Sequence, residues 1–213
     1  MTGGVGLRRF VGTPEQALAP VREQPSAEKC EMCGTEVGAR HGHVVDIEHR
    51  SLMCACRACF LLFTRPDAAG GRYRAVPERV LHDPTRPLSP AAWTGLGVPV
   101  NSAFFLRGDS GLAAFYPSPA GATECLLDLA AWARLGEQHP LLAEAQPEVE
   151  AILVREVDGA VETYLVPIDS CYQLVGTVRL YWKGFDGGQE AHEHIDEFFA
   201  DLRARARPLY PEE

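Results

Sequence analysis

Cys30-Glu31-Met32-Cys33-Gly34 and Cys54-Ala55-Cys56-Arg57-Ala58-Cys59 hold five of the seven cysteines of the chain within one short segment. The spacing Cys-x-x-Cys occurs once in each stretch. Two such pairs supply the four thiolates that a closed, tetrahedral metal site takes from a short piece of chain. We therefore expect a metal site made of four residues: Cys30, Cys33, Cys56 and Cys59.

The residues around these cysteines predict a treble-clef-like metal module over residues 28–66. The first pair is typical of a knuckle, a tight turn in which Gly34 relieves backbone strain at the exit. Residues 43–47 and 52–56 form the two strands of a hairpin, and residues 60–63 read as helical. The second cysteine pair would then lie at the start of a helix. Knuckle, hairpin and helix are the successive parts of a treble clef.

The hairpin brings further candidate ligands near the cysteine pairs. If the chain reverses between His49 and Arg50, His43 lies opposite Cys56, and Cys54 points to the same side. His43 and Cys54 are therefore candidates for groups beside the metal or for alternative ligands. A packed small hydrophobe is the commoner role of a spare cysteine. His41 and His49 are expected at the surface.

Zinc is the first choice of metal, because closed four-thiolate sites suit it and usually stabilise structure. Iron in a rubredoxin-like site is the alternative, although rubredoxin-type proteins follow both pairs with glycine and Phe60 follows Cys59 here. An iron–sulfur cluster that recruits Cys54 is a further alternative.

Two other functions of treble clefs are disfavoured. His43 with Asp46 partly matches the HNH nucleases, but the helix that should carry further metal ligands does not follow. Residues 28–66 contain five basic and five acidic residues, and the whole chain has a net charge of -9. Since binding to nucleic acid depends on neutralising phosphates, we expect no nucleic-acid partner.

No catalytic set is evident, so the protein is more consistent with a non-enzyme. Cys125 and Cys171 stand alone, without a paired base. His192 and His194 lie among glutamates and are typical of a solvated polar helix face.

The remaining sequence predicts an α+β domain over residues 72–208, an antiparallel sheet with packed helices, after a flexible arm over residues 1–27. Asp158-Gly159 between residues 150–157 and 161–168 is a strong hairpin signal. A second hairpin joins residues 98–106 to 112–116. Helices are expected to begin at Ser89 and to cover residues 124–137, 169–182 and 189–205.

The chain is expected to be cytoplasmic and to lack a membrane span. No apolar run approaches the roughly 20 residues that cross a bilayer. Arg8-Arg9 precedes no apolar segment of the kind that an export signal needs.

Two sets of residues carry a resemblance to a known family. The first joins the cysteine stretches to His41-Gly42-His43 and Asp46. The second comprises residues 116–124 and Leu165-Val166-Pro167-Ile168-Asp169. Together they resemble an uncharacterised actinobacterial family encoded beside high-affinity uptake [NiFe] hydrogenases. The resemblance implies an accessory of hydrogenase assembly or electron transfer, whose partner is a hydrogenase subunit or a maturation factor.

Overall fold

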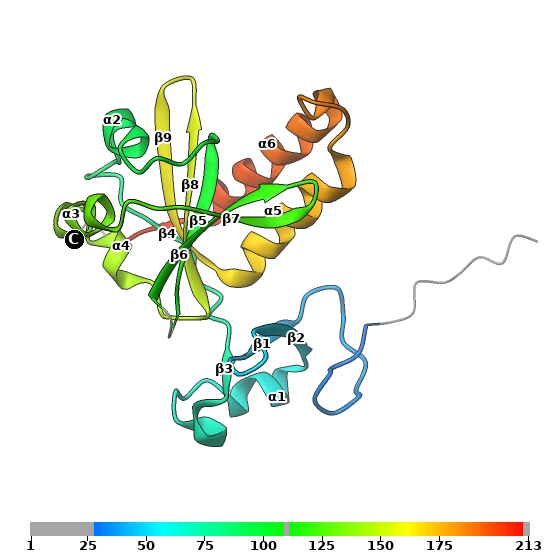
Figure 1. Ribbon diagram of the computed structural model, residues 1–213. Helices are drawn as coiled ribbons and strands as arrows, with labels where there is room; N and C mark the ends of the chain where they lie inside the picture. The colour runs from blue at the N-terminus through cyan, green and yellow to red at the C-terminus, as the bar shows by residue number, and fades with distance from the viewer. Residues whose placement is uncertain (1–27, 109–110, 211–213) are drawn as a thin grey trace, which may run out of the picture.

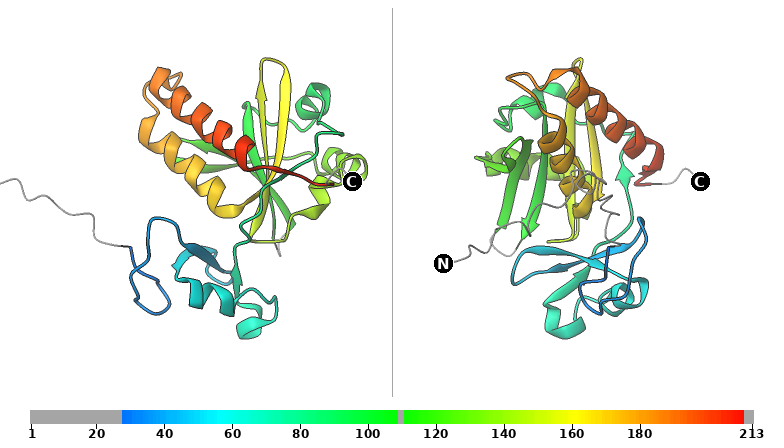
Figure 2. Two further views of the ribbon diagram at one scale, coloured as in Figure 1. Left: turned by 180° about the vertical axis from the view of Figure 1, so that it is seen from behind. Right: turned by 90° about the vertical axis from the view of Figure 1, so that its right-hand side faces the viewer.

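The computed structural model describes residues 28–108 and 111–210, which form a small cysteine module and a larger domain built on one sheet. The cysteine module lies below the domain in Figure 1, and both views of Figure 2 show the two parts joined at one end of the sheet. The arm predicted over residues 1–27 lies outside the described residues. The α+β class and the treble-clef-like module are confirmed.

The cysteine module contains a three-stranded antiparallel sheet in the order β2-β1-β3. Its elements are β1 (Gly42–Asp46), β2 (Ser51–Ala55), α1 (Arg57–Leu62), the 3-10 helix η2 (Ala68–Gly71) and β3 (Tyr73–Ala75). Only Val44, Ala55 and Phe60 form its own buried cluster. Val45 instead belongs to the core of the larger domain, against which Ile47 and Leu52 also pack. The module is therefore docked onto the domain through one face of its hairpin.

The predicted register of the β1–β2 hairpin is wrong. His43 pairs with Cys54 and Val45 pairs with Leu52, so the chain reverses one residue earlier than expected. The reason is local, because the His49 backbone N–H donates to Asp46 Oδ1 at 3.1 Å and closes the turn early. Arg50 completes the turn in the left-handed region, at a φ of 50°.

Gly42 lets the hairpin approach α1, and its replacement is expected to destabilise the module. A Cβ atom at this position would lie 2.6 Å from Phe60 Cδ2, inside the small core. We expect Gly42→Ala to lower the free energy of unfolding of the metal-loaded protein by about 1–3 kcal/mol, as overpacking does elsewhere. Urea unfolding measures the change. Gly38→Ala is the matched control, since nothing lies within 4 Å of its added Cβ; equal losses in both variants would contradict the packing argument.

The larger domain is a seven-stranded sheet in the order β10-β4-β9-β8-β5-β6-β7. Neighbouring strands are antiparallel except β10 and β4, which pair in parallel. The strands are β4 (Leu81–His82), β5 (Ser102–Gly108), β6 (Gly111–Ser118), β7 (Gly121–Cys125), β8 (Glu150–Val157), β9 (Ala160–Pro167) and β10 (Arg207–Pro208).

Both predicted hairpins are confirmed. In β8–β9, Asp158 and Gly159 have positive φ angles of 52° and 77°, as a two-residue turn of the primed type requires. In β5–β6, Phe104 pairs with Phe115, and the two rings stack. The turn residues 109 and 110 lie outside the described part of the chain.

Helices cover both faces of this sheet (Figures 1 and 2). One layer consists of α5 (Ile168–Tyr181) and α6 (Gly188–Arg205), the other of α2 (Pro90–Thr94), α3 (Leu129–Gln138) and α4 (Leu141–Glu144). Along β8, Ala151 and Leu153 belong to the cluster under α5 and α6, whereas Ile152 and Val154 belong to the opposite cluster. The run of buried residues in β8 is thus explained by a sheet with two covered faces.

The helix predicted over residues 124–137 begins later, at Leu129. Residues 121–125 instead extend the sheet as β7, with Glu124 opposite Phe115. Asp128 then caps the helix, because its Oδ1 accepts from the Ala131 N–H at 2.9 Å. The predicted Ser89 cap of α2 is confirmed by a 3.2 Å bond from the Ala92 N–H. Within the described ranges, no helix combines the length and apolar character that crossing a bilayer requires.

Asp83 lies in the turn after β4, and we expect its ionised side chain to stabilise the fold less as the pH becomes acidic. Burial alone would raise the pKa of this carboxyl, but hydrogen bonds from Thr85 and the charge of Arg86 outweigh it and lower the pKa. A lowered folded-state pKa gives stability that is full above the unfolded value of about 4 and is lost as the pH falls through the folded value. The difference in free energy of unfolding between the wild-type protein and the Asp83→Asn variant should therefore shrink below about pH 4. Tryptophan fluorescence in urea at pH 6 and pH 3 measures it; an unchanged difference would contradict the assignment.

Candidate metal centre

The first cysteine pair is held by the predicted knuckle. The Gly34 N–H donates to the Cys30 carbonyl at 2.8 Å, and the Cys30 N–H donates to the Thr35 carbonyl at 2.8 Å. Gly34 has a φ of 76°, which favours glycine. Two bonds then tie the knuckle to β2, because the Glu31 N–H donates to the Cys54 carbonyl and the Cys54 N–H donates to Glu31 Oε2.

The second pair lies where β2 passes into α1. Cys56 is the residue before the first helical position, and Cys59 follows within the first turn. The structure thus brings together the four predicted ligands, whose sulfur atoms all lie within 4.8 Å of one another. Cys33 Sγ and Cys56 Sγ are 3.7 Å apart. A tetrahedral zinc ion with bonds of about 2.3 Å spaces its sulfurs by about 3.8 Å, so the four-cysteine cluster can hold a metal ion of this size.

The thiols of the cluster differ in acidity. Burial raises the pKa of Cys30, but backbone N–H groups of Cys56, Met32 and Cys33 outweigh it and lower the pKa to about 6. Burial raises the pKa of Cys59, and the neighbouring cysteines add to that shift. Four thiolates at these separations repel one another. A bound cation would offset that repulsion and is the natural counter-charge for the cluster.

The spare candidates of the hairpin lie beside this cluster in a group of their own. His41, His43 and Cys54 each offer a ligand atom within 4.8 Å of the others. The expectation that His41 lies at the surface is wrong, since its side chain is only 8% exposed. His49 is exposed, as expected. Cys54 is partly buried. Its pKa is raised mainly by this burial, and the negative charges of Glu31 and Glu28 raise it further.

Asp46 does not face His43, as an HNH-like centre would need. The Asp46 carboxylate is buried and accepts hydrogen bonds from Arg72 Nη2 at 2.9 Å and from the His49 backbone. These bonds, led by those from Arg72, hold the pKa of Asp46 well below its usual range. His43 instead pairs with Asp169 of α5, with 2.8 Å between Nδ1 and Oδ2.

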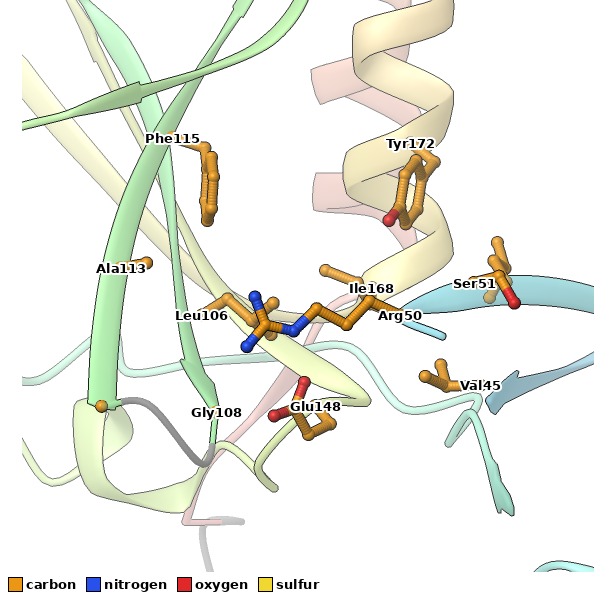
Figure 3. Close-up of a pocket in the computed structure, with 12 residues that line it drawn as sticks. Val45, Arg50, Ser51, Leu106, Gly108, Ala113, Phe115, Glu148, Ile168 and Tyr172 are labelled. Atoms are coloured by element: carbon orange, nitrogen blue, oxygen red, sulfur yellow. The ribbon is translucent and has the colours of Figure 1, made fainter. Parts of the chain in front are cut away.

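A separate pocket of about 180 Å³ lies where the hairpin meets β5, β6 and α5. Figure 3 shows Arg50 reaching from the hairpin across this pocket to the side of Glu148, with Leu106 and Phe115 on one wall and Tyr172 on the other. No histidine or cysteine occurs among the described residues that line it. The pocket therefore belongs to the packing junction of module and domain, not to the cysteine cluster.

Sequence reasoning missed Asp169 and the burial of His41. Asp169 is separated from His43 by 126 positions, and sequence reasoning places it only at the start of the helix expected over residues 169–182. The signal that was present is the alternation of His41 and His43, which places both imidazoles on one side of the strand. The partner on α5 had no signal in the local sequence.

Comparison with known protein families assigns most of the chain to one family. A family of unknown function, DUF5947, matches residues 29–206, which include the whole cysteine cluster and the sheet up to the end of α6. No curated protein and no solved structure matches the chain. Because the match spans far more than half of the sequence, the chain belongs to the family of unknown function DUF5947.

Proposed function

We propose that the protein binds a zinc ion through Cys30, Cys33, Cys56 and Cys59, and that the zinc-stabilised module serves as a non-enzymatic interaction module. The observation that carries this proposal is the approach of the four sulfurs to within 4.8 Å of one another, with Cys33 Sγ and Cys56 Sγ 3.7 Å apart, close to the separation in a tetrahedral thiolate site. The small buried cluster of the module is a second support, because so few apolar residues give little stability without a metal.

The remaining cysteines support a non-enzymatic role. Cys171 is fully buried in the core, and burial raises its pKa. Burial also raises the pKa of Cys125. A thiol with a raised pKa is a poor nucleophile at neutral pH. An HNH-like nuclease is disfavoured because His43 pairs with Asp169 and Asp46 is engaged by Arg72.

The partner that we propose is a subunit or maturation factor of a cytoplasmic [NiFe] uptake hydrogenase. Its support is the resemblance of the sequence motifs, together with the exposed Leu61 and Leu62 on α1 of the module. Copurification with a tagged hydrogenase subunit tests it. We expect recovery of the protein with the subunit and loss of that recovery on Cys33→Ser; equal recovery of both would contradict a role for the module.

A small iron-based electron carrier is the second candidate. Cys33 is exposed, so a metal at this cluster would lie close to the protein surface, as electron transfer requires. Elemental analysis and a visible spectrum after anaerobic purification separate the two. Zinc in a colourless protein, lost on Cys33→Ser, supports the interaction module. Iron with visible absorption overturns it in favour of the carrier.

A further inference from the structure

We propose that His41, His43 and Cys54 form a second metal site, beside the four-cysteine cluster, for a divalent transition-metal ion such as Zn²⁺ or Co²⁺. One potential ligand atom of each residue lies within 4.8 Å of the other two. His43 and Cys54 are directly paired across β1 and β2. His41 lies two residues before His43, so its side chain falls on the same side of the hairpin.

His41 presents a buried nitrogen for which the described part of the chain offers no hydrogen-bond partner. Its Nδ1 lies 2.8 Å from the Gly38 carbonyl oxygen, which can only accept, so Nδ1 carries the proton. In the neutral ring Nε2 then holds the lone pair. That nitrogen is buried and has no hydrogen-bond partner among the described residues, in a side chain that is 8% exposed. A buried acceptor without a partner is costly, and a metal ion would satisfy it.

A carboxylate fixes the tautomer of His43, as the Gly38 carbonyl does for His41. Its Nδ1 lies 2.8 Å from Asp169 Oδ2, so the proton on Nδ1 is donated to the carboxylate and Nε2 is left as the coordinating atom. Metal-ligating histidines usually donate their other N–H to a carboxylate or a carbonyl. Here His43 donates to a carboxylate and His41 donates to a carbonyl. The ring centroids are 4.8 Å apart, so the two imidazoles lie next to each other.

Cys54 completes the set with a sulfur ligand. Its backbone is fixed on both sides by Glu31, through bonds of 2.6 Å and 2.9 Å. Binding replaces the S–H bond by an S–metal bond and releases one proton to solvent. Two imidazoles and a thiolate suit zinc-like ions and do not suit Mg²⁺ or Ca²⁺, which take oxygen ligands.

Three protein ligands leave one coordination position of a tetrahedral ion for another group. His41, His43 and Asp169 also line a pocket of about 450 Å³, together with Gln173 and Arg205. A water molecule or another small ligand can therefore reach the metal from this pocket. An open position distinguishes this site from the closed four-cysteine cluster.

Cobalt titration tests the second site. The full chain is first loaded with one equivalent of Zn²⁺ and then titrated with Co²⁺. We expect one further equivalent to bind with a thiolate-to-cobalt charge-transfer band. Cys54→Ser should abolish that band, and His41→Ala should weaken Co²⁺ binding at least about tenfold. His192→Ala, an exposed histidine of α6, is the matched control and should change nothing.

The zinc content of each variant shows that the first cluster, and with it the module, is still formed. Failure to bind a second equivalent would overturn the proposal. So would a cobalt spectrum that Cys54→Ser leaves unchanged, since that signal would come from exchange into the four-cysteine cluster. A test without any variant uses histidine ¹⁵N NMR. Added Zn²⁺ should shift Nε2 of His41 and His43; unshifted signals would also overturn the second site.

Discussion

Removal of the metal from the four-cysteine cluster is expected to unfold the segment from Cys30 to Ala75 while the seven-stranded sheet stays folded. The module buries only Val44, Ala55 and Phe60 in a cluster of its own. By contrast, the domain has an extensive cluster on each face of its sheet. Structural zinc contributes about 10–16 kcal/mol of apparent binding free energy to isolated zinc fingers, so we expect the module to depend strongly on its metal.

Hydrogen exchange before and after chelation measures this effect. Amides of β1 and β2 should lose protection, whereas those of β8 and β9 should keep it. Cys33→Ser should reproduce the exchange pattern of the chelated protein. Cys125→Ser is the matched control, because this half-buried thiol lies outside the cluster and should leave metal and protection unchanged. Retained protection of the hairpin without metal would contradict the prediction.

Arg79→Ala is expected to lower the free energy of unfolding of the domain by about 3 kcal/mol. Glu150 is fully buried at the start of β8, and Arg79 donates to both of its carboxylate oxygens, at 2.7 Å and 2.8 Å. Without the guanidinium, the bond from the Gln146 N–H is the hydrogen bond to that carboxylate that remains among the described residues. Breaking a buried pair leaves an uncompensated charge, which accounts for the size of the effect.

A double variant separates the ion pair from the surrounding packing. Arg79→Leu/Glu150→Leu should recover at least half of the loss, because apolar replacement of both partners removes the unpaired charge. Urea unfolding followed by tryptophan fluorescence gives each free energy. Arg205→Ala removes an exposed pair with Asp201 and should cost less than about 0.5 kcal/mol. If Arg79→Ala costs no more than Arg205→Ala, the buried pair does not stabilise the domain.

Features set by neighbouring residues could be predicted from the sequence. The four cysteines are brought together by a knuckle and a helix start whose signals lie within a few residues of each ligand. The Asp158-Gly159 turn likewise determines its own hairpin. The β1–β2 register could not be predicted, because it depends on the geometry of the Asp46 side chain, which contacts the His49 backbone N–H, the His49 ring and the more distant Arg72.

Features that join distant segments had no signal in one sequence. Glu124 reads as the start of a helix, yet pairing with Phe115 keeps it in a strand. The pairing of His43 with Asp169 depends on how the module docks onto α5. Tertiary packing, and not local propensity, determines that docking.

The position of β4 in the sheet has a consequence for folding during synthesis. Leu81 pairs with Leu165, and its other neighbour Arg207 comes later still, so β4 must wait for most of the domain to be made. The ladder of the cysteine module closes by Ala75. Contacts of short sequence separation form sooner. We therefore expect the nascent chain to complete its metal-binding module before the strands of the sheet that will support it have been made.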